Sequence, residues 1–283
     1  MVSGRPAILN LRLGSRPDSA GLVRAALGGL ATPFVLRPEL LNDLKTAISE
    51  ACNNAVEHAY RGRHGVIAVH VDVGFEAVEA SVRDWGGGFQ SVAPKEDRMG
   101  AGLPLINALA DRAEFLSGPG NGTEVRLWFN MRHDARRDPL LARLEESDDL
   151  EAWTPWRRGL SGDVVVTLLP RELLLGVLEP LSNALAARAR FSLERFSDVN
   201  LLTQAIAAHV ESAGSSARVS FALTAGDGQL DVIIGPLRAG TADGLREQLG
   251  ELADEVVTES LGQSDLVRVV VRDGRRIPRT VHG

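Results

Sequence analysis

A carboxylate and a side-chain amide stand four residues apart in the segment ISEACNNAVEHAY, residues 48–60. These two residues, Glu50 and Asn54, are neighbours on one face if the segment is a helix. A carboxylate beside an amide oxygen can hold Mg2+ through oxygen ligands and can also accept a proton as a general base. Taken alone, however, the pair fits the polar side of a surface helix better than it fits a site.

A glycine-rich segment, VRDWGGGF at residues 82–89, strengthens the interpretation as a site. An alternating strand pattern ends there in Asp84, and the glycines Gly86, Gly87 and Gly88 follow. Glycine permits positive φ angles and a close approach of the backbone to a planar ligand. A buried carboxylate at this position can accept a hydrogen bond from an exocyclic amine such as that of adenine. A simple hairpin exit is the alternative for this segment alone.

Two further segments predict contacts to phosphate and base. In DRMGAGLPLINAL, Gly100 and Gly102 stand immediately before a predicted helix. Free N–H groups at a helix N-terminus bind phosphate, and Arg98 is placed to meet a terminal phosphate. In GNGTEVRL, Thr123 stands at a strand entrance, from which its hydroxyl can reach a base pocket. Each segment is weak by itself, but the four elements in this order predict a nucleotide-binding site.

Helices and a sheet must bring these segments together. Apolar residues at i, i+3 and i+4 spacing, from Leu40 to Ala59, predict a long helix over residues 38–60. Further helices are predicted at 18–31 and near 103–113, and alternation predicts strands at 6–13, 66–73, 77–83 and 123–129. The pattern indicates an α+β fold, a two-layer sandwich in which a mixed sheet is covered by helices on one face.

The order of elements is repeated later in the chain. The predicted division is a first domain at 1–130, a linker at 131–162, a second domain at 163–273 and a tail at 274–283. The linker is highly charged and contains Pro139 and Pro155, as is typical of a segment between domains. In the second domain a helix is predicted over LREQLGELADEVV, before the last strand. Because the identity between the halves is low, a shared order of elements by coincidence is the alternative to duplication.

The second copy lacks the residues that could bind a nucleotide. Alignment of the two long helices puts Gln204 at the position of the carboxylate and Ala208 at that of the amide. Alignment of the hairpins puts Pro236 at the position of Asp84. Without a metal ligand or an acceptor for adenine, we expect a degenerate domain that binds no ATP.

Composition narrows the class of protein. The chain has 283 residues and a net charge of -6, which argues against non-specific nucleic-acid binding. No apolar run approaches the roughly 18 to 20 residues of a membrane span, so no membrane association is expected. A single cysteine, Cys52, excludes an internal disulfide and fits a reducing compartment; we expect a cytoplasmic protein.

Residues 1–130 resemble the ATP-binding domain shared by gyrase B, Hsp90, histidine kinases and MutL, known as the GHKL superfamily or Bergerat fold. Within it they most resemble the bacterial anti-sigma-factor serine kinases: ISEACNNAVEHAY matches the N box, VRDWGGGF the G1 box and RMGAGL the G2 box. The resemblance implies that Glu50 is the general base, that Asn54 holds Mg2+ and that Asp84 reads adenine. It also implies an ATP lid and a structural hydrogen bond of His58. The implied lid is residues 90–99, and the remaining implied nucleotide-binding residues are Gly86, Gly88, Arg98, Gly100, Gly102, Leu103 and Thr123.

The resemblance implies an ATP-dependent regulatory serine/threonine kinase of the partner-switching type. With ATP and Mg2+ it would phosphorylate a serine of an anti-sigma antagonist protein, and it would also bind a sigma factor. The rival interpretation is a non-catalytic switch that binds ATP and sequesters a partner; the retained Glu50 favours the kinase. Proteins of this family pair two such domains side by side, so we expect the second half to act as a built-in dimer partner in a largely monomeric chain.

Overall fold

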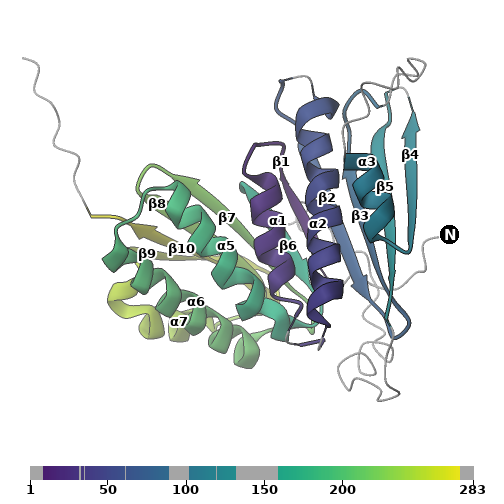
Figure 1. Cartoon of the computed structure of the whole chain (residues 1–283). Coiled ribbons are helices and arrows are strands. Elements are labelled where there is room, and N and C mark those ends of the chain that lie inside the picture. The colour runs from purple at the N-terminus through teal and green to yellow at the C-terminus, as the bar shows by residue number, and fades with distance from the viewer. Residues whose placement is uncertain are drawn as a thin grey trace, which may run out of the picture.

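The computed structural model describes residues 9–31, 33–34, 36–60, 62–88, 102–118, 120–131 and 159–274. In these residues ten strands form one continuous sheet, in the order β4-β5-β3-β2-β1-β6-β7-β8-β10-β9. The helices lie on one face of that sheet (Figure 1). The expected α+β sandwich with helices on one face is therefore confirmed.

The first half of the chain supplies one side of the sheet. Its elements are β1 (Leu9–Gly14), α1 (Ser19–Gly28), α2 (Pro38–Asn54), a π-helical turn (Ala55–Ala59), β2 (Val66–Val73), β3 (Ala77–Asp84), α3 (Gly102–Leu109), β4 (Arg112–Gly118) and β5 (Gly122–Asn130). Pro38 lies at the start of α2, where its missing N–H costs no hydrogen bond. The helix expected near 103–113 is shorter than predicted, because β4 pairs with β5 directly after it and forms an unpredicted strand.

The second half supplies the other side. Its elements are β6 (Val164–Leu168), a short 3-10 turn (Arg171–Leu173), α5 (Leu174–Arg188), α6 (Leu193–Ala213), β7 (Val219–Gly226), β8 (Gln229–Arg238), α7 (Ala242–Leu249), a 3-10 turn (Gly250–Leu252), β9 (Glu255–Leu261) and β10 (Ser264–Arg272). The helix predicted over LREQLGELADEVV is wrong in its last part, because Glu255 already begins β9. Counted outward from the centre, the strand order β6-β7-β8-β10-β9 has the same connectivity as β1-β2-β3-β5-β4.

All nine pairings between neighbouring strands of the described residues are antiparallel, whereas sequence analysis expects a mixed sheet. The connectivity explains the difference. Two helices, α1 and α2, lie between β1 and β2 along the chain, so the chain returns antiparallel to its neighbour. The strands β3 and β4 do run in the same direction, but β5 is inserted between them. No two adjacent strands of the described sheet are therefore parallel.

The halves meet edge to edge at the centre of the sheet. Leu11 of β1 lies opposite Val166 of β6, and both side chains are fully buried under the helices. Burying a leucine or valine side chain of this kind contributes about 1.5–3 kcal/mol. Above the strands, α1 approaches α5 so closely that a Cβ added to Gly29 would lie 2.4 Å from the Gly176 carbonyl oxygen. One hydrophobic core consequently runs through both halves.

Polar contacts also cross this central seam. The Asp163 carboxylate, just before β6, pairs with Arg16 of the first half at 3.2 Å and with Arg188 of α5. Arg188 reaches on to Asp18, before α1, at 3.2 Å. Within the described ranges, no helix is both long enough and apolar enough to cross a membrane.

Candidate functional site

The helix α2 presents the first pair of predicted site residues. Its apolar side includes Ile48 and Cys52, and both side chains are fully buried. Burial raises the pKa of the Cys52 thiol to about 12. On the polar side, Asn54 has a buried Nδ2 atom with no hydrogen-bond partner in the described residues. The two ends of a side-chain amide are assigned from their partners, so the opposite orientation would direct an oxygen to the same place. An orphaned amide there fits a ligand or cation.

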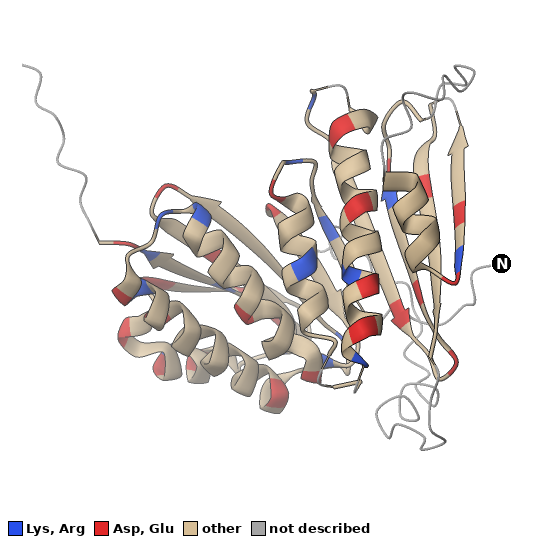
Figure 2. Ribbon diagram, viewed as in Figure 1, with Lys and Arg blue, Asp and Glu red and all other residues tan. Residues whose placement is uncertain are grey.

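Several acidic residues are spread along α2 (Figure 2), so a carboxylate on this helix is not by itself the mark of a site. Glu50 differs from the others because α3 begins against it. A Cβ added to Gly102 would lie 2.3 Å from the Glu50 Oε1 atom. Because glycine has no Cβ, the N-terminus of α3 can approach this carboxylate without displacing it. The next residue, Leu103, is partly buried against the core and anchors the start of α3.

The buried carboxylate of Asp84 lies at the end of β3. Its side chain is 4% exposed, and its Oδ1 atom accepts hydrogen bonds from the backbone N–H groups of Gly86, at 2.8 Å, and Thr123, at 3.2 Å. No donor of the described residues reaches Oδ2. One oxygen thus holds the glycine loop and the start of β5, and the other is left to accept a hydrogen bond from a ligand.

The loop after Asp84 needs glycine for a local reason. Gly88 has φ +66°, and a Cβ on it would lie 2.4 Å from the Gly118 carbonyl oxygen. Opposite it, the Thr123 hydroxyl lies 3.3 Å from the Ser117 hydroxyl, across the β4–β5 pair. The strand β5 therefore places Thr123 beside the carboxylate that holds its backbone.

The structure thus brings together the predicted residues of α2, the end of β3, the start of α3 and the start of β5. Arg98 and Gly100, with the predicted lid, lie outside the described residues. His58 does not occupy the expected structural position: its side chain is 70% exposed, and its described partner is the adjacent Glu57, at 3.8 Å.

Sequence reasoning missed two residues that shape this site. A Cβ on Gly122, which has φ +74°, would lie 2.0 Å from the Asp84 carbonyl oxygen, so this glycine keeps β5 close to β3. Tyr60, the single tyrosine of the chain, binds the glycine loop through its hydroxyl. Both belong to segments that the sequence analysis assigned to the site. Gly122 directly precedes Thr123, and Tyr60 is the last residue of the N box, so these positions could have indicated their roles.

The corresponding region of the second half is built differently. Gln204 and Ala208 are exposed on α6. The connection from β8 to α7 covers only residues 239–241, whereas that from β3 to α3 covers 85–101. A buried carboxylate is present, but it is Asp265 of β10, and its oxygens accept from the Gly240 N–H and the Ser260 hydroxyl, each at 2.8 Å. Both oxygens of Asp265 therefore accept hydrogen bonds from within the protein, unlike Oδ2 of Asp84.

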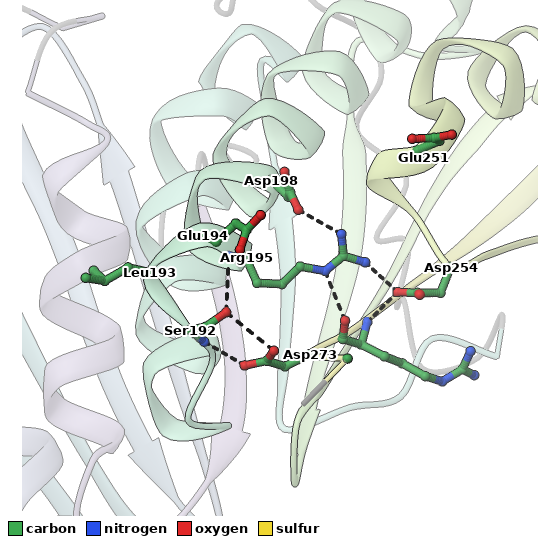
Figure 3. A pocket seen from close by; sticks show the side chains of 10 residues that line it. Ser192, Leu193, Glu194, Arg195, Asp198, Glu251, Asp254 and Asp273 are labelled. Carbon is green, nitrogen blue, oxygen red and sulfur yellow. Dashed lines mark hydrogen bonds and ion pairs between the residues drawn. The ribbon is translucent and has the colours of Figure 1, made fainter. Parts of the chain in front are cut away.

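A separate pocket of about 750 Å³ lies in the second half, between the start of α6 and the end of β10 (Figure 3). Arg195 crosses it and pairs with Asp198 at 2.8 Å and Asp254 at 2.6 Å. Asp273 accepts a hydrogen bond from the Ser192 N–H at 2.6 Å. These charges bind one another and tie the start of α6 to the sheet, which is a structural role.

Comparison with known proteins places the first half. Residues 13–129 match the family described as the histidine kinase-like ATPase domain. A solved structure of the RsbU and RsbW domains of Rv1364c from Mycobacterium tuberculosis is 29% identical, covers 44% of this chain and 32% of that chain, and has a TM-score of 0.36. The anti-sigma F factor of Caldanaerobacter subterraneus is 28% identical over 130 residues, which are 42% of this chain and 91% of the relative. The serine-protein kinase RsbW of Bacillus pumilus is 32% identical over 140 residues, which are 44% of this chain and 86% of the relative. Through its first half, which carries the ATPase domain, the chain therefore belongs to the family of the serine-protein kinase RsbW and the anti-sigma F factor.

Proposed function

We propose that the chain is an ATP-dependent serine-protein kinase of the anti-sigma-factor type. It transfers the γ-phosphate of ATP to a serine of an antagonist protein and binds a sigma factor as its second partner. The observation that carries the proposal is that one helix holds Glu50, against the start of α3, and the orphaned amide of Asn54, and that the π turn extending this helix is hydrogen-bonded to the loop after Asp84. A protein that only bound nucleotide would need Asp84 but would have no use for a carboxylate at residue 50.

Each residue has a role that follows from its surroundings. Asp84 accepts the adenine amine through Oδ2, since Oδ1 is occupied by backbone donors. Glu50 orients the serine hydroxyl and takes its proton. Mg2+, held by Asn54, would neutralise charge on the phosphates. Within the described residues, no group of three or more His, Cys, Asp or Glu side chains could hold a metal ion.

The second half serves, in this proposal, as a built-in dimer partner without a nucleotide site. Three observations support it: the shared connectivity, the pairing of β1 with β6, and the short 239–241 connection that leaves no length for a lid. The internally bonded Asp265 is a fourth, because its oxygens are not free to accept from adenine. The chain would then hold one ATP and need no second copy.

The experiment combines the full chain with Mg2+, γ-labelled ATP and the candidate antagonist proteins of the same genome. The kinase predicts label on a serine of one antagonist. If ATP changes antagonist binding but no label is transferred, the chain is a non-catalytic switch.

A pair of asparagine variants on α2 controls the assay. Asn54→Ala should weaken the Mg2+-dependent part of ATP binding. Asn42→Ala, an exposed asparagine of the same helix, should leave it unchanged.

A further inference from the structure

Tyr60 joins the end of the α2 segment to the loop that carries Asp84. Its hydroxyl donates a hydrogen bond to the Val66 carbonyl at 2.5 Å and accepts one from the Trp85 N–H at 2.9 Å. The ring is fixed from the other side by the backbone: a Cβ on Gly65 would lie 2.2 Å from ring atoms. The hydroxyl is therefore held at one point, between the start of β2 and the residue after Asp84.

The residue before Tyr60 makes a second attachment to the same loop. The Ala59 carbonyl accepts a hydrogen bond from the Gly87 N–H at 3.0 Å. A Cβ on Gly86 would lie 2.1 Å from that carbonyl oxygen, so the two backbones are in direct contact. Two consecutive residues, Ala59 and Tyr60, thus hold the three residues that follow Asp84.

The π-helical turn at Ala55–Ala59 determines where these two residues lie. A residue in an α-helix is rotated by about 100° from the one before it, and a π turn adds a residue to the turn and shifts that phase. The turn begins directly after Asn54. The path from the amide to the carboxylate thus runs through a short series of residues: Asn54, the π turn, Tyr60, the Trp85 N–H and Asp84.

We propose that Tyr60 is a positioning residue of the nucleotide site. By holding the Trp85 N–H it fixes Asp84 relative to Asn54, and so sets the preference of the site for a base with an exocyclic amine. The inference rests on the proposed ATP site, and it concerns the selectivity of that site, not the transfer step.

The test measures dissociation constants of the full chain for ATP and for purine riboside triphosphate, which lacks the 6-amino group. Tyr60→Phe keeps the ring and removes both hydroxyl hydrogen bonds. Without these bonds Asp84 is less well aligned, and weakening of its hydrogen bond to the base corresponds to about 3- to 10-fold in Kd. We expect ATP to bind more weakly by that factor and the analogue to change by less than about 2-fold, so that the preference for ATP falls.

Two more variants make the result decisive. Thr167→Val is the matched control, because it removes the buried hydroxyl bond of 2.8 Å to Ser220, between β6 and β7 of the second half; it should leave the ATP preference intact. Gly65→Ala leaves the Tyr60 side chain chemically intact but displaces its ring, and so moves the hydroxyl away from its hydrogen-bond partners. It should lower the preference for ATP as Tyr60→Phe does. It also gives the answer if Tyr60→Phe does not fold.

The outcomes separate the inference from the proposed function. If the wild type prefers ATP and the variants at residues 60 and 65 keep that preference, the role of Tyr60 is refuted and the ATP site stands. If the wild type binds neither nucleotide, the proposed function and the inference both fail.

Discussion

The substitution Asp84→Asn tests the adenine contact with little disturbance of the loop. An asparagine can retain the oxygen that accepts from Gly86 and Thr123, and it replaces Oδ2 by an NH2 group. The atom that faces the ligand then changes from an acceptor to a donor, opposite an amine that is itself a donor. We therefore expect ATP to lose a hydrogen bond to a charged group, which is about 1.5–3 kcal/mol, or about 10- to 150-fold in Kd.

The second half supplies a matched control for this prediction. Asp265 is 3% exposed, against 4% for Asp84, and it too accepts from a backbone N–H of a glycine loop. Asp265→Asn should therefore carry a similar structural penalty but leave ATP affinity unchanged. Isothermal calorimetry on both full-length variants gives the comparison. Equal loss of ATP affinity in the two variants, or no loss in Asp84→Asn, would refute the assignment of the adenine contact.

Three further predictions concern the contact between Gly102 and Glu50, the buried core, and the central seam between the two halves. Gly102→Ala should slow phosphate transfer, because the added Cβ displaces the Glu50 carboxylate, and should change the melting temperature little, because that end of the side chain is flexible. An unchanged rate would contradict a role for this contact in placing Glu50. The buried thiol of Cys52, with its pKa raised to about 12, should not react with a disulfide reagent at pH 8 until the protein unfolds. Because the thiol ionises above about pH 8.5 only in the unfolded protein, this group should lower the free energy of unfolding as the pH rises. Rapid labelling of the native protein would show that the Cys52 thiol is accessible to the reagent. Removal of residues 131–283 should uncover the β1 edge and make the first half self-associate in light scattering, whereas a strictly monomeric fragment would argue against the built-in partner.

Most of the fold follows from local patterns in the sequence, and the failures have one cause. The long helix from Pro38 and the strand at 66–73 begin where their patterns begin, because spacing of apolar residues at 3.6 or 2 reflects a single buried face. Both missed strands, β4 and β9, lie at the outer edges of the sheet and directly follow a short helix. Edge strands bury less of each side chain, so their alternation is weak, and pairing with a neighbour decides their structure.

The sequence predicts those site residues whose type and spacing indicate a chemical role, and it does not predict residues that act only by positioning them. Glu50 was predictable from its spacing to Asn54 on one helical face, and Asp84 from the glycines that follow it. The contribution of Tyr60 depends on a π turn, which no periodicity indicates, and on a hydrogen bond to a backbone N–H far along the chain. In the second half, Asp265 was missed because it lies on β10, the counterpart of β5, and not on β8, the counterpart of the strand that carries Asp84. Contacts between separate elements are not encoded in local spacing.

The central claim is that Glu50 is the base of a phosphate transfer to serine. The most direct measurement is single-turnover formation of phosphoserine on the antagonist at saturating ATP, with wild type and Glu50→Gln. Glutamine keeps the shape and hydrogen-bonding reach of the side chain but cannot take the proton, so we predict that ATP affinity is retained and that the rate falls about 10²- to 10⁴-fold. A Glu50→Gln variant that forms phosphoserine at the wild-type rate would contradict the account.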